Sequence, residues 1–285
     1  MYSFLISSLI QSFIHLFPHQ NYMWSIEGTA LELTYNYGTD DPNNNNNNNN
    51  NTTFQGYHPG NAEKDGFGHI AFNVDDVYAA CDKLEKAGVT FKKKPEEGRM
   101  KGLAFAYDPD GYWVEIVKRS TPNVIQNEFN FSQTMLRIKD PSKSIPFYEA
   151  LGMTLIRSKD YGDFSNYFMV CSNNKDNMNL QGIGNINNAE NDDAIKKEKV
   201  SMMFPPILEL THNHGTEKDD DFKHYNGNEE GRQGFGHIGF LVDDVYAACD
   251  GIRELGYGFK KVSTFLFYYW KQHFCFLRNF DTLFF

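Results

Sequence analysis

The sequence predicts an α+β protein built from tandem modules, each made of a strand, a helix and further strands. The first observation is an internal duplication, because residues 66–93 and 234–261 are identical at about two-thirds of their positions without a gap. The second is a shorter similar pair, 30–39 and 207–216, which precedes each long match. The third is that alternating apolar runs are followed by segments with helical spacing. One unit is therefore copied in tandem.

The first complete module begins with a strand at 68–74, where GHIAFNV is rich in β-forming apolar residues. Asp75 or Asp76 caps a helix in which apolar residues recur at three and four positions, and Gly88 ends it. The runs GLAFAYD and GYWVEIV flank the turn sequence DPDG at 108–111, which predicts a hairpin.

A second module begins with a strand at 133–138, QTMLRI. Asp140 and Pro141 then open a helix that Gly152 ends, although Pro146 inside it is unfavourable. Further strands are predicted at 153–158, 166–170 and 206–212.

Module counting predicts that both copies are incomplete. Residues 1–23 contain nothing similar to the 133–138 strand, and the similarity between copies stops at Lys261. The nine-residue run Asn43 to Asn51 has nothing to bury and is predicted to be a disordered insertion. The predicted organisation is a non-homologous segment 1–23, a first copy 24–119 lacking its opening module, a linker 120–126, a second copy 127–261 lacking its closing hairpin, and an aromatic-rich tail 262–285.

Composition indicates a globular protein and excludes some functions. The net charge of -10 argues against nucleic-acid binding, which needs a basic face. The apolar first 20 residues lack the basic start of a signal peptide and the length of a spanning helix, so no membrane association is expected. Cys81 and Cys249 occupy equivalent helical positions and are predicted to be buried thiols rather than disulfides, which favours a reducing, cytoplasmic location.

Four motifs and their order resemble glyoxalase I, the lactoylglutathione lyase: QTMLRIKDP, LELTHNHGT, GFGHI and RMKGLAFAYDPDGYWVEI. The resemblance covers 24–119 and 127–261 and implies paired βαβββ modules of the vicinal-oxygen-chelate type. It implies isomerisation of the hemithioacetal of methylglyoxal and glutathione to S-D-lactoylglutathione, a detoxification of methylglyoxal. It also implies that each metal site joins the opening module of one copy to the closing module of the other.

The implied metal ligands are a Gln, a Glu, a His and a second Glu. Carried onto this sequence, they are Gln133 and Glu209 of the second copy with His69 and Glu115 of the first. One amide oxygen, one imidazole and two carboxylates suit Zn²⁺, with nickel or cobalt as alternatives, and leave positions for two substrate oxygens of a developing enediolate.

The complementary site would retain only two of its four ligands, Glu32 and His237, so a single intact site is expected. In that site Glu115, near the end of a strand, is the expected base, which takes the proton from the carbon bearing sulfur and returns one to its neighbour. Glu209 would be the opposite ligand and would serve the other substrate diastereomer.

Further residues match positions that hold glutathione in the family. Arg137 and Asn213 match residues that grip it, and Arg suits carboxylates. Arg99, Met100 and Lys101 match the loop that closes over it.

One position departs from the family. Four residues before His69, the family has an Arg that holds a glutathione carboxylate, whereas this chain has Asp65 with Lys64 beside it. We therefore expect a raised KM for the hemithioacetal, which an Asp65→Arg substitution should lower.

Each site residue also has a purely structural interpretation: His69 alone would be a core histidine, and each Glu a solvent-facing strand residue. The alternative function is therefore a catalytically degenerate, glyoxalase-like ligand-binding protein. A ring-cleaving dioxygenase is weaker, since Gln133 with one His does not give the two-His-one-carboxylate set. A monomer with fused copies is expected, with a dimer as the alternative.

Overall fold

The structure, a computed structural model, describes residues 29–37, 39, 56–61, 64–119, 128–171, 206–229, 231–262 and 275–278. The chain divides into two compact units, Met1–Gly38 and Thr39–Phe285. In the first unit, residues 29–36 carry no helix or strand and are exposed. The expectations for the segment 1–23, the asparagine run and the linker 120–126 lie outside the described residues, and the division into copies stays a prediction.

The second unit contains two complete strand-helix-strands modules. The first consists of β1 (Phe67–Val74), α2 (Val77–Lys86), β2 (Phe91–Lys93), β3 (Ala104–Tyr107) and β4 (Trp113–Lys118). The second consists of β5 (Asn130–Ile138), α3 (Pro141–Ala150), β6 (Met153–Asp160), β7 (Phe164–Cys171) and β8 (Ile207–Asn213). The predicted α+β fold class with βαβββ modules is confirmed.

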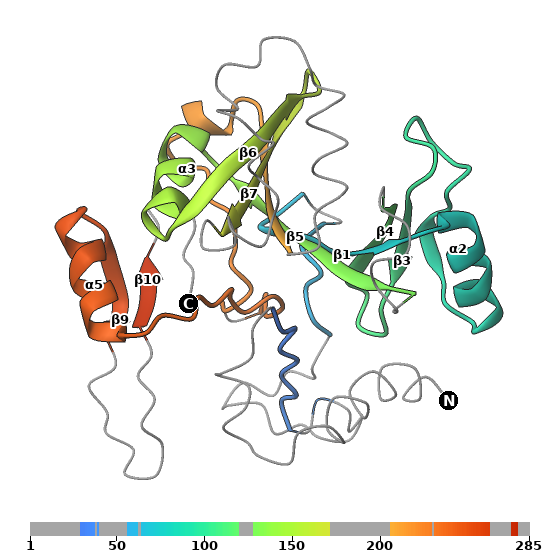
Figure 1. Cartoon of the computed structure of the whole chain (residues 1–285), viewed down its shortest axis with the longest axis horizontal. Coiled ribbons are helices and arrows are strands. Elements are labelled where there is room, and N and C mark those ends of the chain that lie inside the picture. The colour runs from blue at the N-terminus through green and yellow to red at the C-terminus, as the bar shows by residue number, and fades with distance from the viewer. Residues whose placement is uncertain are drawn as a thin grey trace. The chain divides into compact units, whose positions relative to one another are not determined.

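The two modules share one eight-stranded sheet in the order β2-β3-β4-β1-β5-β8-β7-β6. Within each module the first strand pairs with the last in parallel, β1 with β4 and β5 with β8. The antiparallel pairing of β1 with β5 joins the modules, so the four central strands come from both (Figure 1).

Local sequence sets the helix limits. Asp76 caps α2 by accepting a hydrogen bond from Ala79 N, and Asp140 caps α3 through Ser142 N. Gly88 and Gly152 follow the two helices with φ of 88° and 85°, the left-handed conformation that glycine favours. Helix α3 continues through Pro146 despite the missing backbone donor.

Alternation along the strands separates two faces of the sheet. One face carries the apolar cores under the helices: α2 covers Val74, Ala104 and Ile116, while α3 covers a second cluster that includes Leu136 and Leu210. Since side chains alternate along a strand, the residues between them point to the opposite face. That opposite face holds the candidate site.

The second copy of the duplicated segment forms its helix but not its strand. Helix α5 (Val245–Glu254) is capped by Asp244, and β9 (Gly258–Val262) pairs with β10 (Cys275–Arg278), a strand inside the predicted tail. Residues 235–242, which match β1 in sequence, lie outside any strand. Among the described residues no strand pairs with them, and an unpaired segment cannot satisfy its backbone groups as β-sheet does.

The expectation for the cysteines was half right. Cys81 is a buried free thiol, and burial raises its pKa to about 11. Cys249, predicted to be unpaired, is disulfide-bonded, so that expectation is wrong. The disulfide could not be predicted from the sequence, because a buried position on a helix does not show whether a second cysteine lies close enough in the fold to form the bond. The cytoplasmic location therefore stays a prediction. In the described part of the chain no helix has the length and apolar character needed to cross a membrane.

Candidate metal centre

The four sequence-predicted metal ligands lie on four neighbouring strands in the middle of the sheet. His69 is on β1, Glu115 on β4, Gln133 on β5 and Glu209 on β8. The register places Glu115 opposite Ala71, and Ala71 opposite Gln133, in one row across three strands. Because paired residues project from the same face, the pairing of β1 with β5 brings side chains of both modules together.

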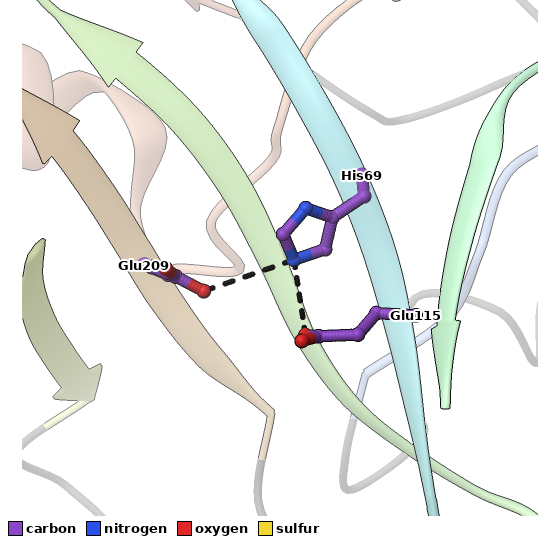
Figure 2. A group of neighbouring side chains, drawn as sticks. All are labelled: His69, Glu115 and Glu209. Atoms are coloured by element: carbon purple, nitrogen blue, oxygen red, sulfur yellow. Dashed lines mark ion pairs between the residues drawn. The ribbon is translucent and has the colours of Figure 1, made fainter. Parts of the chain in front are cut away.

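The carboxylates of Glu115 and Glu209 converge on His69 (Figure 2). Its Nε2 atom lies 3.1 Å from Glu115 Oε2 and 3.8 Å from Glu209 Oε2. The ligating atoms of the three residues all lie within 4.8 Å of one another. Gln133 Nε2 donates to both Oε2 atoms, at 2.8 Å each, so the amide bridges the two carboxylates. All three titratable side chains are buried.

The electrostatics of this cluster show a shortage of positive charge. Burial lowers the pKa of His69, but the Glu115 and Glu209 carboxylates outweigh it and raise the pKa above its ordinary 6.5. Burial, aided by Glu115 and opposed by His69, raises the pKa of Glu209 to about 7. Two buried carboxylates close together favour a bound proton or cation, because water cannot stabilise both charges there.

These residues fit a divalent metal ion. Both ring nitrogens of His69 are buried: Nδ1 has no hydrogen-bond partner, and Nε2 faces the two carboxylates as an ion-pair contact, an arrangement in which an imidazole nitrogen is suited to ligation. The two Oε2 atoms face the same point as His69 Nε2. Rotation of the Gln133 amide by half a turn would place its oxygen where its nitrogen now bridges the carboxylates. One imidazole and two or three oxygen ligands are a donor set that Zn²⁺ accepts.

Arg137 lies further along β5 on the same face of the sheet as Gln133. It is buried, and its Nη2 donates to Asn61 Oδ1 at 2.6 Å, while Nε and Nη1 have no hydrogen-bond partner. Burial lowers its pKa to about 10, against the opposing effect of Glu209 and Asp65. Asn213 ends β8, where its carbonyl accepts from Thr216 Oγ1 at 3.0 Å. A buried guanidinium with two donor nitrogens that make no hydrogen bond is suited to an anionic ligand.

The predicted closing loop, residues 94–103, joins β2 to β3 beside the site. Arg99, Met100 and Lys101 are exposed, and within the described residues no contact links them to His69 or its two carboxylates. The loop returns to the sheet near Phe105, whose ring lies 5.3 Å from that of His69. The end of the loop therefore lies close to His69, whereas these three side chains do not contact it.

Asp65, the departure from the family, is held by groups from a distant part of the chain. Its carboxylate accepts hydrogen bonds from Tyr225 N and from Arg232 Nη2, each at 3.0 Å, and His224 Nδ1 lies 3.5 Å away. Burial raises the pKa of Asp65, but the contacts with His224 and Tyr225 N and the nearby Arg232 guanidinium lower it by more, so the pKa falls below the ordinary 3.8. The carboxylate is ionised but paired, which weakens the repulsion expected from it.

The complementary site, for which Glu32 and His237 are the two expected ligands, stays a prediction. Glu32 and His237 are both exposed, and the one group of described residues with metal-ligand geometry is His69, Glu115 and Glu209.

Three polar neighbours of the site were missed from the sequence. Asn166 and Thr211 support Glu209, and Lys93 lies at the end of β2 close enough for Glu115 to affect its pKa. The sequence carries little sign of them, because Asn166 is a polar residue at the start of the predicted strand 166–170 and Lys93 is one of three consecutive lysines.

The chain is similar to known proteins over most of its length. The model of the Glyoxalase/Bleomycin resistance protein/Dioxygenase superfamily matches residues 21–116 and 130–265. The chain is 40% identical over 239 residues to the lactoylglutathione lyase of Schizosaccharomyces pombe, a match covering 82% of this chain and 68% of that protein. It is 39% identical over 242 residues to glyoxalase I of Saccharomyces cerevisiae, covering 81% and 63%. The crystal structure of glyoxalase I from Zea mays matches with a TM-score of 0.49 and 27% identity, covering 74% of this chain and 62% of that one.

The family model and the relatives place the chain in a family. It belongs to the glyoxalase, bleomycin resistance protein and dioxygenase superfamily. Within that superfamily its relatives are glyoxalase I proteins, so the resemblance drawn from the sequence motifs is confirmed. The chain spans about two-thirds of the length of these two relatives.

Proposed function

We propose that this protein is a metal-dependent lactoylglutathione lyase with a single working site, formed by His69, Glu115, Gln133 and Glu209. The observation that carries the proposal is the convergence of two buried carboxylates on one nitrogen of a buried imidazole, on the sheet face opposite the helices. A histidine that served only to pack would not need two buried carboxylates at one ring nitrogen, because burying each charge costs free energy.

The reaction moves protons without a net change in oxidation state. Glu115 takes the proton from the carbon that carries sulfur and the hydroxyl, and returns a proton to the neighbouring carbonyl carbon. The hydroxyl proton passes to the former carbonyl oxygen, which leaves a thioester and a new alcohol. A bound Zn²⁺, or nickel or cobalt in its place, would supply the positive charge that stabilises the two oxygens while the carbon is deprotonated.

The chain's own residues supply position and environment. Burial of the two carboxylates excludes water, which strengthens the electrostatic interactions inside the site. Arg137 has two nitrogens without a hydrogen-bond partner, and together with Asn213 it would bind a carboxylate of glutathione. Arg99, Met100 and Lys101 would cover the bound glutathione from the exposed loop.

The test is hemithioacetal isomerisation by the purified, zinc-reconstituted chain beside a Glu115→Gln variant. We expect the substitution to lower kcat by about 100- to 10,000-fold, the usual contribution of a positioned base. Glu149→Gln, an exposed glutamate on α3, is the matched control and should leave kcat unchanged.

The alternative, a degenerate ligand-binding relative, predicts a different outcome. A folded, zinc-loaded chain that shows no isomerisation would favour it and refute the proposal. Activity that survives in Glu115→Gln would show that this carboxylate is not the base.

A further inference from the structure

The two carboxylates of the site are held unequally. Glu209 accepts a hydrogen bond at each oxygen, from Gln133 at Oε2 and from Asn166 Nδ2 at Oε1. Glu115 accepts from Gln133 at Oε2, where His69 Nε2 also lies 3.1 Å away, and among the described residues no donor reaches its Oε1. One carboxylate is therefore fixed at both oxygens, and the other at one.

Asn166 is itself oriented by a neighbour. Thr211 Oγ1 donates to Asn166 Oδ1 at 3.0 Å, which leaves the amide nitrogen facing Glu209. Asn166 and Thr211 are partners in the pairing of β7 with β8, and Glu209 lies two residues before Thr211 on the same face. Thr211 is 3% exposed, so little water competes for its hydroxyl. The chain from Thr211 to Asn166 to Glu209 is a rigid support built into two strands.

We propose that Asn166 is a positioning residue that fixes Glu209 as a permanent metal ligand, and that this support leaves Glu115 as the carboxylate free to move. The inference rests on the proposed function and adds the reason why one carboxylate rather than the other serves as base. The Oε2 atoms of Glu115 and Glu209 both face His69 Nε2, so the positions of these atoms alone do not show which carboxylate is the base. A base must leave its place to accept the substrate proton, and a carboxylate held at both oxygens resists that movement.

The first test is the affinity for Zn²⁺, measured by competition with a chromophoric chelator. Asn166→Ala should bind Zn²⁺ about 10- to 100-fold more weakly, as is usual when a residue behind a metal ligand is removed. Thr211→Val, which keeps the side-chain shape, should weaken binding in the same direction but less. Thr211→Ser keeps the hydroxyl and should bind as the wild type does. Thr154→Val on the edge strand β6 is the matched control.

The second test is a double-mutant cycle for kcat at saturating zinc. If Asn166 restrains Glu209, then its removal lets Glu209 act as a substitute base. Glu115→Gln should therefore cost at least about tenfold less in the Asn166→Ala background than in the wild type. A merely structural role for Asn166 would give additive losses.

The outcomes separate the inference from the function on which it rests. A wild type that binds zinc and isomerises the hemithioacetal, with Asn166→Ala and Thr211→Val equal to it in zinc affinity and an additive cycle, would overturn the inference alone. A wild type that does neither would overturn both. Thr211→Val gives the same decision if circular dichroism shows that Asn166→Ala is unfolded.

Discussion

At Asp65, the effect of a single charge depends on the groups that surround it in the fold. In the sequence, Asp65 stands where the family has an arginine, which predicts that its carboxylate repels glutathione. In the fold, Arg232 and Tyr225 N both hydrogen-bond to it, and the Arg232 guanidinium also lies 3.9 Å from the centre of the Tyr225 ring. The raised KM stays a prediction, but the charge that would cause it is largely paired.

The Asp65 network predicts a pH dependence of stability. Because the folded-state pKa of Asp65 lies below the ordinary 3.8, its ionised form stabilises the fold at neutral pH, and this contribution is lost as pH falls through that lower pKa. We expect Asp65→Asn to unfold at a lower urea concentration than the wild type at pH 7, and the difference to shrink toward about pH 3.

Urea titrations at several pH values measure this difference. Asp219 carries an exposed carboxylate directly after the 3₁₀ turn that follows β8, and Asp219→Asn is the control, which should show no such trend. A gap between Asp65→Asn and wild type that stays constant down to pH 3 would contradict the prediction.

At the residue scale, the ligand set could be predicted and its support could not. His69, Glu115, Gln133 and Glu209 stand in motifs that can be recognised from the sequence. Asn166 acts only because β7 lies beside β8, and a polar residue in a strand gives no sign of which carboxylate it will contact.

At the scale of elements, the loop 94–103 depends on one lysine. Lys93 Nζ donates to the carbonyl oxygens of Met100 at 2.8 Å and Leu103 at 2.6 Å, so the ammonium closes the loop from inside. Burial lowers its pKa, and Glu97 acts in the opposite direction. The neighbouring Lys94 instead forms an exposed ion pair with Glu85.

This arrangement predicts different effects for two adjacent lysines. Lys93→Met should leave the loop carbonyls without their donor, destabilise the protein by about 1–3 kcal/mol and speed tryptic cleavage after Arg99 and Lys101. Lys94→Met should change neither the stability nor the cleavage rate appreciably, as is usual for an exposed ion pair. Limited proteolysis with urea unfolding compares them, and equal cleavage rates in both variants would show that Lys93 does not hold the loop.

The duplicated segment shows which elements the local sequence can determine without tertiary contacts. Helices α2 and α5 form in both copies, since Asp76 and Asp244 cap them and the helical hydrogen bonds are local. The strand that precedes each helix forms only in the first copy, as β1. A strand needs partners, which β1 finds in β4 and β5, and the described residues offer none to 235–242.

For the whole molecule, the pairing of β1 with β5 joins two modules and creates the site between them. Because one chain supplies all four proposed ligands, we expect a monomer to be sufficient, and light scattering after size exclusion would detect the dimer that is the alternative. Metal binding should also stabilise this junction.

Removal of the metal should therefore lower the thermal stability. A chelator-treated chain should melt at a lower temperature than the zinc-loaded one, since zinc at 100 times its Kd adds about 2.7 kcal/mol to the free energy of unfolding. His69→Ala is the control, because it should melt at the same temperature with and without zinc. A wild-type Tm that does not depend on zinc would contradict a metal centre at this junction.

The sequence by itself determined the modules, the helix caps, the face on which each strand residue lies and the identity of the proposed ligands. These follow from alternation, helical spacing and motifs, which are properties of neighbouring residues. Only the tertiary structure decided that one GFGHI segment becomes a strand, that Cys249 is paired, that Asp65 meets Arg232 and that Glu209 rather than Glu115 is held at both oxygens. Each of these depends on which distant strands and loops lie side by side, and the local pattern of a strand fixes its face without fixing its neighbour.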